Sequence, residues 1–270
     1  MRAESRWAVL AVAVLLAAAC SRPGKVKPPK IKGSEQIAPT YHLEDNAQTK
    51  RRVQVREHLA LAGQRLASGE LGQAESEVRK ALRLDPESAD ALTLLGVIEG
   101  QRGRTEAAGQ YYRRAAELAP DRGETLNNYG AWLCANGYPA EALVWFDRAL
   151  EAPGYGSPAS ALANAGGCAL ESGQAERAVR DLRRALEIEP ANAYALASMA
   201  GYQYGQGRWF EARAFVERRL AAAPANAAVL QLAASIEDKL GDRAAANRYQ
   251  QRLRTEFPQA ATAQAGEGQK

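Results

Sequence analysis

The stretch ADALTLLGVIEGQRGRTEAAGQYYRRAAELAP, residues 89–120, decides the fold. Its first half is apolar and rich in small residues, Gly103 interrupts it, and an alanine-rich second half ends at Pro120. Apolar residues recur at helical spacing in both halves, and glycine and proline mark the points where helices stop. The stretch therefore predicts two short helices joined by a tight turn.

The same pattern recurs along the chain at a nearly constant interval. The turn glycines are separated by 34, 34, 36, 34 and 34 residues, and they lie at positions 69, 103, 137, 173, 207 and 241. A helix pair repeated every 34 residues is typical of tetratricopeptide repeats. We expect an all-α fold in which six such repeats, residues 55–258, stack into a right-handed superhelical solenoid.

Alignment of the six units predicts where their helices cross. Position 20 is alanine in every unit: Ala74, Ala108, Ala142, Ala178, Ala212 and Ala246. A small side chain is needed there because a larger one would force the two backbones apart. Phe146, at position 24, is expected to be buried. Between the third and fourth units the period lengthens by two residues at APGYGSP, residues 152–158, a corner that we expect to display Tyr155.

The N-terminus reads as an export signal. Residues 1–19 combine Arg2 and Arg6 with an apolar run that is too short to span a bilayer. The run ends in LLAAAC, which resembles a bacterial lipobox and predicts lipidation of Cys20. Ser21 after the cysteine, by resemblance to enterobacterial lipoproteins, favours the periplasmic face of the outer membrane. The alternative is a cleavable signal with an incidental cysteine.

Residues 20–54 are expected to form a basic, proline-rich tether between the lipid and the repeats. Nine lysines and arginines oppose three acids over residues 21–56, and four prolines interrupt any helix. Because an exported, anchored chain meets little nucleic acid, we expect no nucleic-acid partner and consider anionic lipid headgroups the better match. Residues 259–270 are expected to be a disordered tail.

Nothing in the sequence predicts catalysis. The chain lacks the phosphate-loop, nucleophile-elbow and zinc-protease motifs, and its two histidines, His42 and His58, have no partners at metal-ligand spacing. After six repeats, residues 259–270 remain in this sequence, and we do not expect them to form a catalytic domain. We therefore expect no enzyme activity, no cofactor, no metal and no small-molecule substrate.

Candidate contact residues lie on the first helices of the repeats, which line the concave surface of such solenoids. Small residues at position 9 would leave a groove, and amides and tyrosines nearby could bind a partner's backbone. The predicted groove comprises Asn127, Asn128, Ala131, Asn164, Gly167, Tyr194 and Tyr204. For Asn128 and Asn164, at position 6, local hydrogen bonding between units is the alternative role.

Two cysteines fall on neighbouring first helices, Cys134 at position 12 and Cys168 at position 10. In an oxidising periplasm a disulfide between them is feasible. Alternatively they are two buried thiols, since the two-position offset could point their Cβ atoms apart.

Taken together, LNNYGAWLC (residues 126–134), the insertion after the third repeat, the six units and the lipobox resemble the PilF/PilW family of type IV pilus biogenesis lipoproteins. Trp132 stands where that family would be expected to have Phe. The resemblance implies a pilotin-like protein that binds a PilQ-type secretin and promotes its outer-membrane localisation or multimerisation. The alternative is another envelope adaptor, of a Tad-type pilus or a cell-wall synthesis complex.

Overall fold

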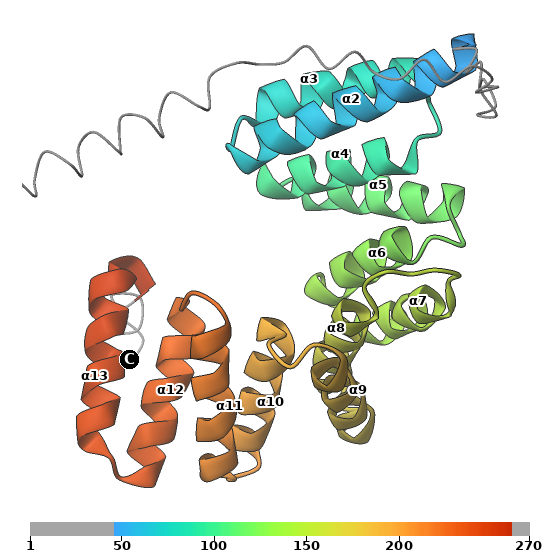
Figure 1. Cartoon of the computed structure of the whole chain (residues 1–270). Coiled ribbons are helices and arrows are strands. Elements are labelled where there is room, and N and C mark those ends of the chain that lie inside the picture. Colours follow the sequence, from blue (N-terminus) through green and yellow to red (C-terminus); the bar gives the residue numbers. More distant parts are fainter. Residues whose placement is uncertain (1–45, 261–270) are drawn as a thin grey trace, which may run out of the picture. The chain divides into compact units, whose positions relative to one another are not determined.

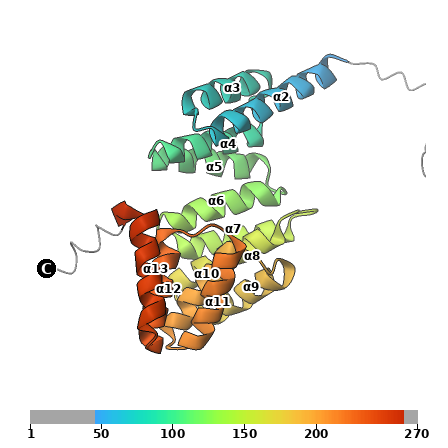
Figure 2. The ribbon, with the colours of Figure 1, turned by 60° about the vertical axis from the view of Figure 1, so that its left-hand side comes forward.

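The computed structural model describes residues 46–260, and every regular element within that range is a helix. The helices form six pairs, each joined by a short turn, and every pair contacts the next one in chain order (Figure 1). The pairs are α2 (Ala47–Ala67) with α3 (Leu71–Leu84), α4 (Ala89–Gln101) with α5 (Thr105–Leu118), α6 (Gly123–Ala135) with α7 (Pro139–Glu151), α8 (Pro158–Glu171) with α9 (Ala175–Ile188), α10 (Ala193–Gly205) with α11 (Trp209–Ala222), and α12 (Ala227–Leu240) with α13 (Arg243–Glu256). The predicted all-α solenoid of six repeats is confirmed, and Figure 2 shows the same succession of pairs after rotation.

The ends of the helices follow from local chemistry. Gly103, between α4 and α5, has φ +74°, and the six turn glycines have φ between +71° and +85°. Residues that carry a side chain rarely adopt this left-handed backbone conformation, so glycine is found where the chain leaves the first helix. At the start of first helices, Ser88 accepts a hydrogen bond from the N–H of Ala91 (3.3 Å) and Asn192 accepts one from Ala195 (2.9 Å).

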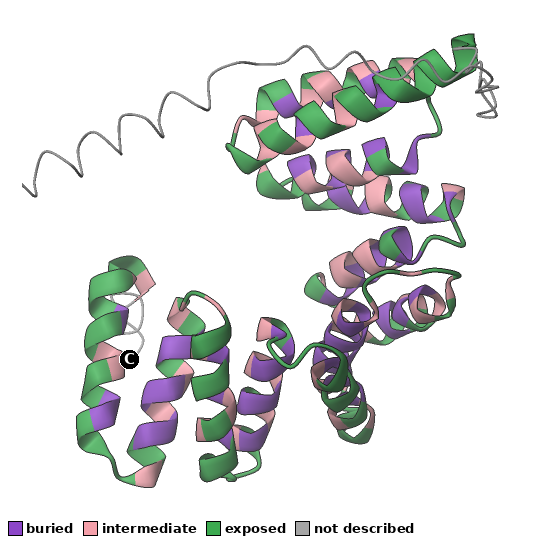
Figure 3. Cartoon of the chain, viewed as in Figure 1, coloured by how far each residue is buried: buried purple, intermediate pink, exposed green. Residues whose placement is uncertain are grey.

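The closest packing within a pair joins position 8 of the first helix to position 24 of the second. In the second, third and fourth units a Cβ added at position 8 would lie under 3 Å from the position-24 side chain; the facing pairs are Gly96 and Tyr112, Gly130 and Phe146, and Gly166 and Leu182. Phe146 is fully buried, and the six position-20 alanines are at most 1% exposed, as predicted. Buried residues therefore concentrate where the helices of a pair meet (Figure 3).

The first helix is longer than the repeat alignment predicts. It begins at Ala47, and Asn46 caps it by accepting a hydrogen bond from the N–H of Thr49 (2.8 Å). Residues 47–54, assigned from sequence to the tether, are therefore helical. Cys20, His42 and the rest of the predicted signal and tether up to residue 45, together with residues 261–270, lie outside the described residues. Within residues 46–260 no helix is both long and apolar enough to cross a membrane.

The insertion between α7 and α8 packs against the chain instead of displaying its tyrosine. Tyr155 is half-buried, and a Cβ added at Gly123 would lie 2.4 Å from its ring. Burial raises the pKa of the Tyr155 hydroxyl to about 12, and the charge of Glu124 adds to the shift. The expectation of a displayed Tyr155 was wrong because the glycine that begins α6 leaves a space that the ring fills.

Candidate functional site

The predicted groove residues separate into distinct local sites. Asn164 on α8 donates its side-chain N–H to Oδ1 of Asn127 on α6, at 3.1 Å. This bond links the first helices of the third and fourth repeats, so Asn164 performs the inter-unit role that the sequence left as an alternative. Both side chains are partly buried, and their mutual bond uses hydrogen-bonding capacity that a partner would otherwise take up.

Asn128 and Ala131 face a different space, a cavity of about 360 Å³ between α6 and the preceding pair. Its lining is mainly apolar, and it is formed by Val97, Gly100, Thr105, Ala108, Tyr112, Asn128, Ala131, Trp132, Ala135 and Asn136. Asn128 is only partly exposed, and its amide makes no hydrogen bond to any other residue in the described range 46–260. An apolar hollow with one free amide can accept an apolar side chain and fix the backbone beside it.

Trp132 forms one wall of this cavity, a role that the sequence reading missed. Its indole N–H donates to the carbonyl of Thr105 (3.2 Å), and its ring lies over Gly109 of α5, where an added Cβ would be 2.3 Å away. The residue in the sequence that could have indicated this contact is Gly109. A glycine inside a helix costs about 1 kcal/mol relative to alanine, so its presence indicates a close approach by another group.

The remaining three groove candidates, Gly167, Tyr194 and Tyr204, pack against other residues of the chain. At Gly167, an added Cβ would lie 2.3 Å from the hydroxyl oxygen of Tyr194, so the space expected at this position is filled by a tyrosine from α10. Burial raises the pKa of the Tyr194 hydroxyl. Tyr204 is half-buried against the core cluster that includes Ala200 and Val216. Elsewhere at position 9, Gly201 has open space around it.

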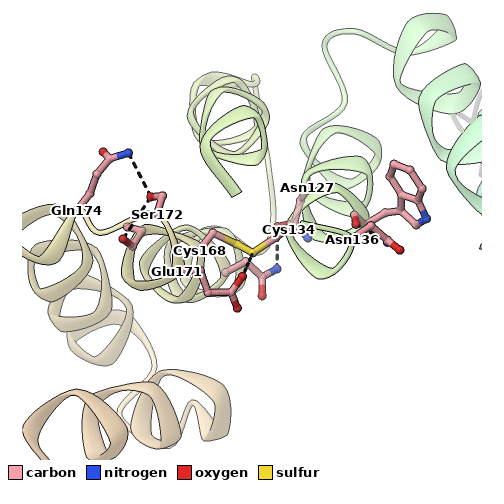
Figure 4. The surroundings of a disulfide bond; sticks show 10 residues. Asn127, Cys134, Asn136, Cys168, Glu171, Ser172 and Gln174 are labelled. Atoms are coloured by element: carbon pink, nitrogen blue, oxygen red, sulfur yellow. Dashed lines mark hydrogen bonds between the residues drawn. A yellow bond between two sulfur atoms is a disulfide. The ribbon is translucent and has the colours of Figure 1, made fainter. Parts of the chain in front are cut away.

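Cys134 and Cys168 are joined by a disulfide, with their Cα atoms 5.8 Å apart (Figure 4). The two-position offset does not separate them, because α6 and α8 lie in contact. Glu171 lies beside the bond, with Oε2 3.6 Å from Sγ of Cys134. The disulfide and the Asn127–Asn164 hydrogen bond therefore join the same two helices, α6 and α8, and α6 also carries Asn128.

A charged network joins the first two repeats. Glu75 accepts hydrogen bonds from Arg102 (2.6 Å) and Arg79 (2.6 Å), and the buried Glu99 accepts them from Arg104 (2.6 Å) and Arg102 (3.2 Å). Arg102 holds the pKa of Glu75 below its ordinary value, and Arg104 does the same for Glu99. Both carboxylates are therefore charged and paired at neutral pH.

This network predicts acid sensitivity. Because the folded-state pKa values are lowered, the two carboxylates contribute stability above their unfolded pKa, near 4.5, and that stability is lost as pH falls through the folded values. The double variant Glu75→Gln/Glu99→Gln should be less stable at pH 7 and should lose less stability on acidification to about pH 3. Urea unfolding midpoints at both pH values measure this. The exposed pair Glu106→Gln/Glu211→Gln should behave as wild type; equal acid sensitivity of all three proteins would contradict the prediction.

No group of histidine, cysteine, aspartate or glutamate residues able to hold a metal occurs within residues 46–260. His58 lies with Nδ1 2.7 Å from Oε2 of Glu77, which also pairs with Lys80. This contact joins α2 to α3 and gives the histidine a structural role.

Comparisons with known proteins agree with this architecture. Residues 89–122 and residues 169–236 each match the family described as tetratricopeptide repeat. The type IV pilus assembly protein PilF of Pseudomonas aeruginosa is 27% identical over 196 residues, which cover 72% of this chain and 77% of PilF.

Two solved structures have the same arrangement of helices. PilW, described as a widely conserved type IV pilus biogenesis factor, is 28% identical with a TM-score of 0.69, and the match covers 77% of this chain and 97% of PilW. The structure of Pseudomonas aeruginosa PilF also gives a TM-score of 0.69 at 24% identity, with 82% of this chain and 100% of that chain covered. At this level of identity, the likeness to the PilF structure shows that the fold is shared.

Proposed function

We propose that this chain, a PilF/PilW-like tetratricopeptide-repeat protein, is a non-catalytic lipoprotein of type IV pilus biogenesis. It binds a PilQ-type secretin and promotes the secretin's localisation to the outer membrane and its multimerisation there. Homology to PilF and likeness to PilW support the link to pilus biogenesis. The observation that carries the binding role is the apolar cavity beside the Asn128 amide, which has no hydrogen-bond partner within residues 46–260.

In this proposal the cavity holds one apolar side chain of an extended secretin segment. The Asn128 amide has both a donor and an acceptor, so it can bind the N–H and C=O of one residue of that extended segment, which point to the same side of the chain. Trp132 and Tyr112 supply aromatic surface, which is enriched at the energetic centres of protein interfaces. Asn128 and Trp132 lie on α6, which the disulfide also holds, so little ordering of that helix is needed on binding.

The lipid on Cys20 would keep the repeats at the inner leaflet of the outer membrane. Anchoring raises the effective concentration of the binding site near a membrane-bound partner without any new contact. The lipobox-like LLAAAC supports this part of the proposal.

The test in cells is the state of the secretin in the outer membrane. In cells lacking this chain, unboiled gels and membrane fractionation should show that SDS-resistant secretin multimers are lost or accumulate in the inner membrane. A Cys20→Ala variant should reproduce that defect although the repeats still fold. Normal multimers in the outer membrane of the deletion strain would overturn the proposal.

Filling the cavity tests the binding site itself. Ala131→Leu places a larger side chain in the cavity and should weaken binding of the purified repeats to the secretin by roughly tenfold, as expected for loss of a central anchor pocket. The matched control is Gly201→Leu, at the same repeat position in the fifth unit, where the surroundings are open. Isothermal titration calorimetry measures both. If the two variants bind alike, the secretin uses another surface.

A further inference from the structure

A second cleft, unrelated to the cavity beside Asn128, lies between α9 and the α10–α11 turn. It encloses about 770 Å³ and is lined by Ala175, Glu176, Val179, Arg180, Arg183, Arg184, Glu187, Tyr202, Gln203 and Arg208. We propose that this cleft is a docking surface for an extended acidic segment of a partner protein, one in which carboxylates flank an aliphatic or aromatic side chain. The inference goes beyond the proposed secretin site and shares no residue with it.

The arginines of the cleft differ from their counterparts in the second repeat. Positions 25, 26 and 29 of the second repeat are Arg113, Arg114 and Glu117. Both arginines pair with the glutamate, at 2.9 Å and 3.6 Å. The fourth repeat has the same residue types at the same positions, Arg183, Arg184 and Glu187. Within the part of the chain that the structure describes, these three side chains form no hydrogen bond or ion pair with another residue.

Consequently, the two exposed guanidinium groups of Arg183 and Arg184 beside this cleft have no carboxylate partner among residues 46–260. Arg180 and Arg208 add positive charge at the same cleft: Arg180 pairs with the neighbouring Asp181 (3.1 Å), and Arg208 donates to the neutral amide of the buried Gln203 (3.4 Å). The four arginines still outnumber the carboxylates when Asp181, the partner of Arg180, is counted with the lining residues Glu176 and Glu187. This excess of positive charge favours carboxylates on the ligand.

The shape and the remaining lining favour a peptide over other anionic partners. Val179 and Tyr202 are half-buried in the cleft and offer apolar surface to a side chain, which a phosphate backbone would not use. Glu176 and Glu187 can accept hydrogen bonds from peptide N–H groups, which a phosphate backbone lacks. A hollow of this kind is matched by an inserted chain, whereas a membrane surface is flat. An acidic segment with an apolar side chain satisfies both the charge and the shape.

The test uses purified repeats and a fluorescein-labelled peptide of sequence Glu-Leu-Glu-Glu-Leu-Glu, with binding measured by fluorescence anisotropy. Wild type should bind it, and binding should weaken as salt increases. Arg183→Ala/Arg184→Ala should bind about tenfold more weakly, since each solvent-exposed pairing contributes a factor of roughly two to five. Arg113→Ala/Arg114→Ala, with the same change in net charge at the same repeat positions, should bind as wild type.

Other results would overturn the proposal. Equal weakening by both double variants would mean that net charge alone attracts the peptide. Equal binding of a peptide with lysine in place of glutamate would remove the charge argument. Absence of peptide binding, combined with sedimentation of the repeats on phosphatidylglycerol vesicles through Arg183 and Arg184, would identify a lipid surface as the occupant. None of these outcomes bears on the secretin site, which Ala131→Leu tests separately.

Discussion

Removing the disulfide by Cys134→Ala/Cys168→Ala is expected to lower the free energy of unfolding of the third and fourth repeats by roughly 3 to 4 kcal/mol. The cysteines are 34 residues apart, and the cross-link restricts the unfolded chain over that whole loop. Alanine is the suitable replacement because both positions are buried and a serine hydroxyl would need a partner there.

The measurement is equilibrium unfolding in urea, followed by tryptophan fluorescence. Trp132 and Trp145 lie in the third repeat, and Trp209 begins α11 of the fifth. All proteins therefore carry Trp209→Phe, so that the signal reports on the region that the disulfide holds, which matters because solenoids need not unfold in one step. Reduction of wild type should lower the midpoint as the variant does, and the variant itself should be insensitive to reductant. Identical midpoints for oxidised and reduced wild type would contradict a stabilising role.

Phe146→Ala is expected to destabilise the same region by about 3 to 5 kcal/mol, the usual cost of truncating a buried aromatic side chain. Phe146 is fully buried on α7, and its ring covers Gly130 of α6, which has no side chain to fill the resulting space. The cavity would therefore collapse only partly, which places the cost toward the upper end of the range.

The control for this variant lies two residues away on the same helix. Val144 is 57% exposed, so Val144→Ala should change stability by less than about 0.5 kcal/mol. The midpoints of both variants, measured as for the disulfide, separate loss of packing from a general effect on α7. A small loss for Phe146→Ala, comparable with that of Val144→Ala, would mean that the two helices of the third repeat repack around the deletion.

Both predictions concern the stability of the unit that presents Asn128 and Trp132. The disulfide joins α6 to α8, and Phe146 joins α6 to α7, so α6 is held from two directions. We expect that weakening either link also lowers the affinity of the cavity for its partner, because a more mobile α6 must be ordered on binding and that ordering costs free energy.

The sequence alone determined the repeat architecture. The 34-residue interval, the turn glycines and the position-20 alanines depend on backbone conformation and close helix crossing, which are local constraints repeated in every unit. It placed the start of the first helix too late, at Val55, because the repeat alignment begins there, whereas the helix extends back to its N-cap, Asn46. It also identified the first helices as the layer that holds the candidate contact residues.

Only the tertiary structure decided which of those residues are available to a partner. Asn127 and Asn128 are adjacent in sequence, yet one pairs with Asn164 and the other faces the cavity, because successive side chains of a helix point in directions about 100° apart. The space at Gly167 is filled by Tyr194 from the next unit. Such outcomes depend on side chains contributed by neighbouring repeats, and a repeat pattern specifies the positions of those side chains without specifying which of them meet.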